Sequence, residues 1–455
     1  MRSLAIACGF TRSFVPVLAA IVTGCAGAAP SLPYMQGGNA LRALGSTGAG
    51  KISHVVYIVQ ENRSFNNMFM GYPGAYTVNY GYNSKGKKIA LKPYPLGPAY
   101  VINHAAADMF AACNGTGKLP GTDCRMNGFD KEQAYGGPEN PEYVYVPRRQ
   151  SKPYWDMAHE GVLADRMFQS QLDESFVAHQ YIIAAQADWS VDLPGGQWGC
   201  GGGKWDTVAT LNVDRSYGPD IVPCYDYETL GDELDKAHRT WKFYAASYGS
   251  ASSGGTGEEW SSYSAIKHIV DGPDWKKDVI SPNWSFLIDV KKGKLANFTW
   301  ITPVCDDSDH VNCEGDYGPS WVAALVNAVG ESKFWDSTAI FIQWDDWGGL
   351  YDPVAPAHLD RDSLGFRVPL IVLSPYAKNG YVSHVPYETA SVLRFAEDLY
   401  GLPQLSKADT RANSPAGDCF DFSQSPRPFV KIAAPYPPKF FMHNRAENYF
   451  APDYE

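Results

Sequence analysis

Two short apolar segments of this chain change abruptly to acidic and amide side chains, and this pattern strongly constrains the fold. Residues 55–59 are almost wholly apolar, and Gln60, Glu61 and Asn62 follow directly. Residues 339–342 are also apolar, and the pair Asp345-Asp346 follows shortly after them. Short apolar runs bounded by polar residues are typical of buried strands. The polar groups are therefore expected where two strands of a sheet end.

Further apolar segments of this kind alternate with helical patterns along the chain. Buried strands are predicted at residues 55–59, 241–246, 298–303, 338–343 and 368–373. Helices are predicted at residues 154–160, 176–187, 229–238, 320–329 and 389–400. Strands that alternate with helices are typical of a largely parallel sheet covered by helices on both faces. The predicted fold class is therefore α/β, with a large, mostly parallel central sheet.

Composition narrows the range of functions. The chain has 455 residues, of which 45% are hydrophobic and 19% charged, an ordinary balance for a globular protein with ample core. Its formal net charge of -11 argues against a broad nucleic-acid-binding surface, so we expect no nucleic-acid partner. The negative charge does not exclude an anionic substrate, because a bound metal ion can reverse the local field.

The first 28 residues have the pattern of a signal peptide. Arg2 and Arg12 supply positive charge, and residues 14–22 form a mostly apolar segment that is short for a membrane span. The sequence VTGC at residues 22–25 resembles a bacterial lipoprotein box with Cys25 as the lipidated residue. The alternative is ordinary signal cleavage nearby, with Cys25 removed. We expect export to the periplasm, the outer membrane or the medium, a flexible segment at residues 29–50, and one catalytic domain at residues 51–455.

Cysteine usage agrees with export. Three pairs of cysteines are close in sequence and one further cysteine, Cys419, is left over; the pairs are Cys113 with Cys124, Cys200 with Cys224, and Cys305 with Cys313. In an oxidising compartment such pairs can form disulfides that close loops. The alternative is a set of unrelated buried thiols.

The two polar strand ends together predict a metal site. Adjacent carboxylates such as Asp345 and Asp346 repel each other, and burying them without a cation would cost stability. Taken alone, the pair could equally belong to a solvated turn. Ligands of α/β sheets bind beyond the carboxyl ends of the strands, where Glu61 and Asn62 would also lie. Three carboxylates and an amide oxygen form an oxygen-rich shell for one divalent cation, and calcium, magnesium and zinc all remain open.

A candidate nucleophile lies in the sequence DESFVAHQYIIAAQ, where Ser175 precedes a helical pattern. At a helix N-terminus, free amide groups and the helix dipole favour a phosphate group and an ionised alkoxide. Coordination to a metal ion would also lower the pKa of the serine hydroxyl. The alternative is that Ser175 only caps the helix, since serine is a favoured N-cap residue.

Four motifs together resemble a known family. HVVYIVQENRSFNNMF, YWDMAHEGVLADRMFQSQLDESF, WDDWGGLYD and GFRVPLIVLSPYAKNGYVSH are similar to the bacterial phosphoesterase family of secreted acid phosphatases and phospholipases C, in the alkaline-phosphatase-like superfamily. The likeness extends from about residue 51 to about residue 422. It implies an alkaline-phosphatase-like fold and one metal ion surrounded by Glu61, Asn62, Asp345, Asp346 and the nucleophile Ser175.

The resemblance also assigns roles to histidines. His104 matches a family position near the phosphate, and His310 resembles an active-site histidine that protonates the leaving oxygen or binds phosphate oxygens. His268 is a further candidate for substrate binding. His159 and His179 lie within helical patterns, and we expect them to pack in the core or face solvent.

The resemblance implies a hydrolase acting on phosphoric esters, and three functions remain open. The first is a secreted phosphomonoesterase of acid phosphatase type that forms a phosphoserine intermediate; serine at the nucleophile position favours it, since threonine is typical of the phospholipases. The second is a phospholipase C that hydrolyses phospholipid headgroup diesters. The third is a catalytically silent surface binding protein. The expected partners are phosphoester small molecules, with phospholipids as an alternative. A lipid anchor would in addition attach the protein to a membrane.

Overall fold

In the computed structural model, which describes residues 47–97, 100–246, 260–313 and 315–442, eight strands form one central sheet. In spatial order the strands are β13 (Val279–Ile280), β12 (Trp241–Tyr244), β14 (Phe298–Ile301), β1 (His54–Gln60), β15 (Thr338–Trp344), β16 (Leu370–Leu373), β8 (Val162–Ala164) and β17 (Tyr381–Ser383). The predicted signal peptide and the lipidation site at Cys25 lie outside the described residues.

Strand direction confirms the predicted fold class. β16 pairs antiparallel with both β15 and β8, and the other neighbouring pairs of this sheet are parallel. The sheet is therefore mixed rather than purely parallel, with one reversed strand. All five predicted strands belong to it, whereas β8, β13 and β17 contain only two or three residues each and were not predicted.

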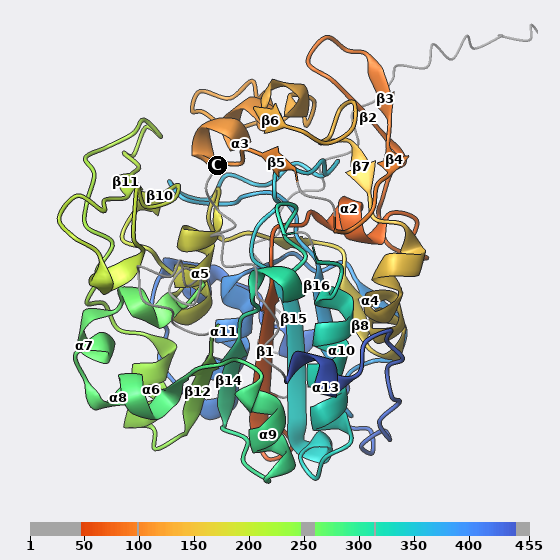
Figure 1. Ribbon diagram of the computed structural model, residues 1–455, viewed down its shortest axis with the longest axis vertical. Coiled ribbons are helices and arrows are strands. Elements are labelled where there is room, and N and C mark those ends of the chain that lie inside the picture. Colours follow the sequence, from red (N-terminus) through yellow and green to blue (C-terminus); the bar gives the residue numbers. More distant parts are fainter. Residues whose placement is uncertain (1–46, 98–99, 247–259, 314, 443–455) are drawn as a thin grey trace, which may run out of the picture. The chain divides into compact units, whose positions relative to one another are not determined.

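Helices cover both faces of the sheet, which explains why the central strands are apolar throughout. β15 is buried along its whole length, as expected for a strand with neighbours on both faces. One helical layer contains α4 (Arg148–Glu160), α9 (Ser285–Lys291), α10 (Gly318–Gly330) and α13 (Pro438–Phe441), and the other contains α5 (Ser175–Ala184), α6 (Leu230–Lys236), α11 (Ala390–Tyr400) and α12 (Lys407–Arg411). Figure 1 shows α9 and α10 in front of the sheet and α11 behind it. Within the described part of the chain, no helix has the length and apolar character needed to cross a membrane.

Short elements form a cap over the carboxyl ends of β1 and β15 (Figure 1). The cap contains α2 (Phe65–Phe69), α3 (Ala106–Cys113) and small ladders that pair β2 (Tyr80–Tyr82) with β3 (Lys88–Ala90), β4 (Lys92–Pro93) with β7 (Val144–Tyr145), β5 (Val101–Ile102) with β6 (Ala134–Tyr135), and β10 (Ser190–Val191) with β11 (Ala209–Thr210). A further ladder pairs β9 (Met167–Phe168) with β18 (Tyr387–Glu388). The helices α7 (Lys267–Val270) and α8 (Pro273–Asp278) lie near β13 and β12, at one end of the sheet. The short 3-10 helices are η1 (Phe129–Lys131), η2 (Gly199–Gly201), η5 (Ser262–Ala265), η6 (Cys305–Asp307), η7 (Trp335–Ser337) and η8 (Pro415–Gly417).

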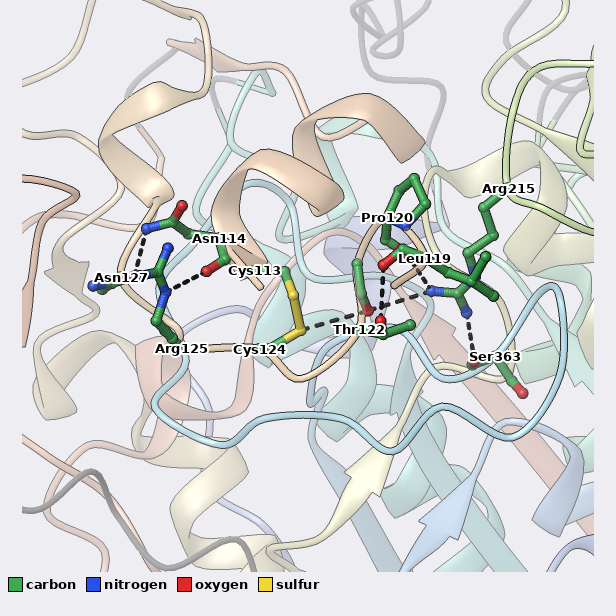
Figure 2. Close-up of a disulfide and its surroundings, with 11 residues drawn as sticks. Cys113, Asn114, Leu119, Pro120, Thr122, Cys124, Arg125, Asn127, Arg215 and Ser363 are labelled. Carbon is green, nitrogen blue, oxygen red and sulfur yellow. Dashed lines mark hydrogen bonds between the residues drawn. A yellow bond between two sulfur atoms is a disulfide. The ribbon is translucent and has the colours of Figure 1, made fainter. Parts of the chain in front are cut away.

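Disulfides and buried polar contacts hold the loops of the cap. All three predicted pairs are disulfides: Cys113–Cys124, Cys200–Cys224 and Cys305–Cys313, while Cys419 is a buried free thiol. Figure 2 shows the first disulfide beside the guanidinium group of Arg215, which donates hydrogen bonds to the carbonyl oxygens of Pro120 (2.9 Å) and Ser363 (2.8 Å). The buried guanidinium group of Arg215 thereby joins three loops that are distant in sequence.

Candidate active site

The ends of β1 and β15 bring the two polar motifs together. The two strands pair in parallel up to Gln60 opposite Trp344, so Glu61 and Asp345 leave the sheet side by side. The backbone amide of Asp345 donates to the carbonyl oxygen of Gln60 (2.9 Å), and the backbone amide of Asn62 donates to Oδ1 of Asp345 (3.0 Å). Glu61, Asn62, Asp345 and Asp346 have no exposed surface. The predicted convergence of the two strand ends is therefore present.

Local backbone geometry fixes the turns that carry these groups. Asn62 adopts φ of 54°, a left-handed conformation that asparagine tolerates better than most residues. Gly348 also has a positive φ (+60°), and a Cβ atom at this position would lie 2.2 Å from the carbonyl oxygen of Asn62. The amide of Gly348 donates to Oδ1 of Asp346 (2.8 Å). Glycine is required here because the two turns are in direct contact.

Ser175 is the first residue of α5, as the sequence predicts, and its hydroxyl lies against both strand ends. Its Oγ atom donates to Oδ2 of Asp346 (3.2 Å) and lies 3.3 Å from the side-chain amide of Asn62. The free backbone amides and the dipole at the N-terminus of this ten-residue helix favour an anion next to Ser175.

His179 lies one helical turn after Ser175. Its ring is buried, as expected for a packing residue, and it also joins the same cluster, which the sequence pattern did not indicate. Its Nε2 atom lies 3.1 Å from Oε1 of Glu61 and 3.6 Å from Oδ2 of Asp345. Its Nδ1 atom donates to the carbonyl oxygen of Trp260 (3.1 Å). Residues four apart lie on the same face of a helix, and this spacing from Ser175 is the sequence signal that could have identified His179.

His104 enters the cluster from the cap, just after β5. Its Nδ1 atom donates to the carbonyl oxygen of Ile102 (2.9 Å), which fixes the ring. Its Nε2 atom lies 3.0 Å from the side-chain amide of Asn62 and 3.5 Å from Oδ2 of Asp346. These contacts place His104 in the same cluster, and its position near a bound phosphate stays a prediction.

His310 comes from the loop after β14, the strand on the other side of β1. Its Nδ1 atom accepts a hydrogen bond from the amide of Asn312 (3.1 Å), so the proton of the neutral ring is on Nε2. When the oxygen of the Asn62 amide faces the ring, that Nε2–H group donates to it at 3.0 Å. The disulfide Cys305–Cys313 closes this loop.

The neighbouring Asp309 anchors the His310 loop to both strand ends. Its Oδ2 atom accepts hydrogen bonds from the hydroxyl of Tyr154 (2.8 Å) and from the indole nitrogen of Trp344 (2.9 Å). Its carbonyl oxygen accepts from Nε of Arg63 (2.6 Å). Trp344 precedes Asp345 and Arg63 follows Asn62, so the same anchor connects His310 to both polar motifs. Burial raises the pKa of the Asp309 carboxyl to about 6.

The donor set of the cluster fits a divalent cation. Burial, and secondarily the charge of Asp346, raise the pKa of Asp345 to about 6, and its buried Oδ2 atom accepts no hydrogen bond from any described residue. Glu61, His179 and Asp345 offer ligand atoms that all lie within 4.8 Å of one another. A cation would offset the repulsion between these buried carboxylates.

The side-chain amide of Asn62 has two possible orientations in this cluster. With its nitrogen toward the carboxylates, it donates to Oε2 of Glu61, Oδ1 of Asp345 and Oγ of Ser175, each at 3.3 Å. In the opposite orientation, the amide oxygen of Asn62 faces these three oxygen atoms instead. Hydrogen bonding alone favours the first orientation, whereas a cation among the oxygens favours the second.

Two other polar groups do not join the cluster. His268 on α7 is partly exposed and pairs with Asp226 (2.8 Å) and Asp232 (3.0 Å). The helix α7 packs on α8, which contacts β13 and β12 at one end of the sheet. The predicted substrate-binding role of His268 is not supported by any contact with the cluster. Asp352 follows Gly348-Gly349 in the sequence WDDWGGLYD. Its carboxylate is bound by the buried guanidinium group of Arg367 (3.0 Å). The Asp352 carboxylate is thus occupied by a structural ion pair.

Fold and site together define an α/β protein that gathers a buried cluster of acidic, amide, hydroxyl and imidazole groups at the carboxyl ends of its central strands. A family model described as "Phosphoesterase family" matches residues 52–403, a range that includes every residue of this cluster. The chain belongs to the phosphoesterase family.

Curated relatives are similar to this chain at low identity. The non-hemolytic phospholipase C of Burkholderia pseudomallei is 25% identical over 83% of this chain and 60% of its own length. Phospholipase C B of Mycobacterium tuberculosis is 25% identical over 46% of each chain, and the non-specific phospholipase C1 of Arabidopsis thaliana is 22% identical over 81% of this chain and 73% of its own. The chain thus spans about half to three quarters of these relatives.

A solved structure described as a protein in the alkaline phosphatase superfamily from Vibrio parahaemolyticus also matches. It has a TM-score of 0.36 and 10% identity, and the match covers 81% of this chain and 71% of that chain. A score of this size carries no conclusion about function.

Proposed function

We propose that this protein is an exported, metal-dependent phosphoesterase that hydrolyses phosphate monoesters through a phosphoserine intermediate on Ser175. The observation that carries the proposal is the position of the Ser175 hydroxyl. It lies at the start of α5, 3.2 Å from a carboxylate oxygen of Asp346 and 3.3 Å from the amide of Asn62. A nucleophile needs a nearby base and a site for the phosphoryl oxygens, and this location provides both.

The proposed metal ligands are Glu61, Asn62, Ser175, Asp345 and Asp346. Their buried oxygen atoms, and the Oδ2 atom of Asp345 that accepts no hydrogen bond from a described residue, support a cation at this place. When bound, a divalent cation would lower the pKa of the serine hydroxyl and neutralise charge on the phosphoryl group. Relatives in the same family with phospholipase C names are consistent with a phosphoester as the substrate.

We assign the proton transfers of the first step from the side chains that surround Ser175. The Ser175 hydroxyl gives its proton to Asp346, and Oγ forms a bond to phosphorus while the bond from phosphorus to the leaving oxygen breaks. The Nε2–H group of His310 donates a hydrogen bond to the leaving oxygen, which departs with the electron pair of the broken bond and takes a proton from a solvent water molecule. His104, held by the carbonyl of Ile102, orients the phosphoryl group together with the N-terminus of α5.

The second step reverses the first with water as the nucleophile. The attacking water molecule gives up one proton, which neutralises the hydroxide left when the leaving oxygen took its proton from solvent. The new bond from water oxygen to phosphorus forms as the bond from phosphorus to Oγ of Ser175 breaks, and Asp346 returns the proton to Oγ. Inorganic phosphate leaves, Ser175 and Asp346 recover their starting protonation states, and the solvent has neither gained nor lost a proton.

A phospholipase C activity is the second candidate, because the relatives at 22–25% identity carry that name. Serine at position 175 favours the monoesterase, given its resemblance to the acid phosphatase branch. Parallel assays with p-nitrophenyl phosphate and p-nitrophenylphosphorylcholine separate the two. We expect the higher kcat/KM for the monoester, and no turnover by Ser175→Ala with the fold intact. Faster hydrolysis of the choline diester would favour the phospholipase, and no metal-dependent hydrolysis of either would indicate a silent binding protein.

Export is the proposed location. The three disulfides are typical of an oxidising compartment, in agreement with the predicted signal peptide. Fractionation of the native host followed by mass spectrometry of the mature N-terminus would test this proposal. A cytosolic protein that retains residues 1–28 would contradict it, and an acylated Cys25 would establish a lipid anchor.

A further inference from the structure

We propose that His179 supplies a nitrogen ligand to the same metal ion, and that this ligand gives the site a preference for a transition metal ion over Ca²⁺ and Mg²⁺. The inference rests on the metal centre of the proposed function. It adds a residue that the sequence pattern did not assign, and it narrows the class of metal.

The hydrogen bond on the far side of the ring determines which nitrogen faces the carboxylates. A carbonyl oxygen only accepts hydrogen bonds, so the contact with Trp260 places a proton on Nδ1 of His179 (3.1 Å). The neutral ring then has a lone pair on Nε2, directed toward the carboxylates of Glu61 and Asp345. Lone pairs on all three groups repel one another, and a cation between them turns the repulsion into three favourable contacts.

The distances agree with shared ligation. Nε2 of His179 lies 3.1 Å from the Glu61 carboxylate and 3.6 Å from the Asp345 carboxylate. Two ligand atoms that are each about 2.1 Å from one ion lie roughly 3 to 3.5 Å apart. A charged imidazolium ring could donate from Nε2 to Glu61. The 3.6 Å between Nε2 of His179 and Oδ2 of Asp345 is too long for a hydrogen bond, so Oδ2 would still accept none from the described residues. A common cation satisfies both carboxylates.

The environment of the ring is also typical of a metal ligand. Histidines that bind metals commonly donate their second N–H group to a carbonyl or carboxylate, which fixes the tautomer and the ring orientation, and Trp260 provides such a carbonyl. Imidazole nitrogen favours Zn²⁺, Fe²⁺ and related ions, whereas Ca²⁺ and Mg²⁺ prefer sites made wholly of oxygen atoms. The combination of His179 with Glu61 and Asp345 therefore selects against the two hard cations.

Metal binding by the full-length protein tests the inference without an activity assay. The protein is stripped with a chelator, and its affinities for Zn²⁺, Ca²⁺ and Mg²⁺ are measured by calorimetry for wild type, His179→Gln and Glu61→Gln. His384→Gln serves as the control, because that histidine is exposed and pairs with Asp165 outside the cluster. We expect His179→Gln to lose at least tenfold in Zn²⁺ affinity with little change for Ca²⁺, and the control to match wild type. Thermal melting of the metal-free variants shows whether each one folds.

X-ray absorption of the Zn²⁺-loaded protein gives a second readout, and its wild-type spectrum alone shows whether imidazole binds the ion. We expect imidazole scattering from the ion in wild type, and less of it in His179→Gln. A wild-type spectrum without imidazole, or unchanged Zn²⁺ affinity in His179→Gln beside a large loss in Glu61→Gln, would overturn the role of His179 while leaving the metal centre intact. Absence of specific metal binding by wild type would overturn both proposals.

Discussion

The backbone amide of Asn62 donates a hydrogen bond to Oδ1 of Asp345 at 3.0 Å, across the ends of two paired strands. This contact joins the two polar motifs, which are 283 residues apart in sequence, before any ligand is considered. A site built on strand ends is held by the sheet itself, so small changes at these turns should alter metal binding more than they alter the fold.

Replacement of Glu61 should remove metal and activity together. Glu61→Gln keeps the size of the side chain but removes one of the buried charges that we assign to the cation. We expect a loss of at least about 100-fold in kcat/KM, on the order of 3 kcal/mol of transition-state stabilisation, and a matching loss of bound metal. Elemental analysis and kinetics on the same sample check this. The exposed Glu139→Gln is the control, and full activity of a metal-free Glu61→Gln protein would refute the ligand assignment.

Gly348→Ala should disturb the site because the new Cβ atom would lie 2.2 Å from the carbonyl oxygen of Asn62. Gly86→Ala is a matched control, since Gly86 also has a positive φ but has no atom within 4 Å of the added carbon. Both variants should lose about 1 kcal/mol from the left-handed backbone. Only Gly348→Ala should lose more stability, along with metal and activity. Equal behaviour of the two variants in denaturant titrations and assays would show that the contact is unimportant.

Opening the disulfide that closes the His310 loop should reduce catalysis selectively. Replacement of both Cys305 and Cys313 by alanine removes the covalent closure but leaves the hydrogen bonds of Asp309. We expect a loss of about 2 to 4 kcal/mol in stability and a lower kcat, because His310 is less well positioned. The corresponding double variant of Cys200 and Cys224 should lose stability at a similar level but keep its kcat. An unchanged kcat in the Cys305/Cys313 variant would exclude a positioning role for this disulfide.

A buried acid outside the site should make stability depend on pH. Burial, with a further contribution from the nearby Asp409, raises the pKa of Glu397 to about 11. The folded protein therefore keeps this proton at pH values where the unfolded chain has lost it. The free energy of unfolding should fall as pH rises from about 5 toward 9, because the unfolded state binds fewer protons than the folded state in that range. Glu397→Gln does not titrate, so its stability should fall less over the same range.

The test of this prediction is urea unfolding at several pH values. At pH 9, Glu397→Gln should be more stable than wild type by over about 1 kcal/mol, and the two should converge near pH 5. Parallel stability curves for the two proteins would show that Glu397 does not hold a proton in the folded state.

Sequence patterns predicted those parts of the fold and site that depend on local order. The apolar run before Glu61 identified β1, a similar run before Asp345 identified β15, and the helical pattern after Ser175 identified the start of α5. Each of these features is visible within about ten residues. The very short strands β8, β13 and β17 were missed because two or three residues carry no periodicity.

Other features depend on partners that are distant in sequence. His179 resembles any core histidine until the strand ends bring Glu61 beside it, 118 residues away. Asp352 follows the Gly-Gly turn and is available as a ligand by sequence alone, yet Arg367 binds it in the folded chain. His268 is a candidate by residue type alone, and its partners in the structure are Asp226 and Asp232. Tertiary contacts decide the role of a polar residue more than its local sequence does.

Trapping the covalent intermediate tests the central claim most directly. The metal-loaded enzyme is mixed with a phosphate monoester, quenched in acid within one turnover, and mapped by peptide mass spectrometry, with Ser175→Ala treated in the same way. We predict one phosphoryl group on the peptide that contains Ser175 in wild type, none in the variant, and no turnover by the variant. A Ser175→Ala protein that still hydrolyses the substrate at the wild-type rate, or a phosphoryl group on another residue that turns over at the catalytic rate, would contradict the proposed mechanism.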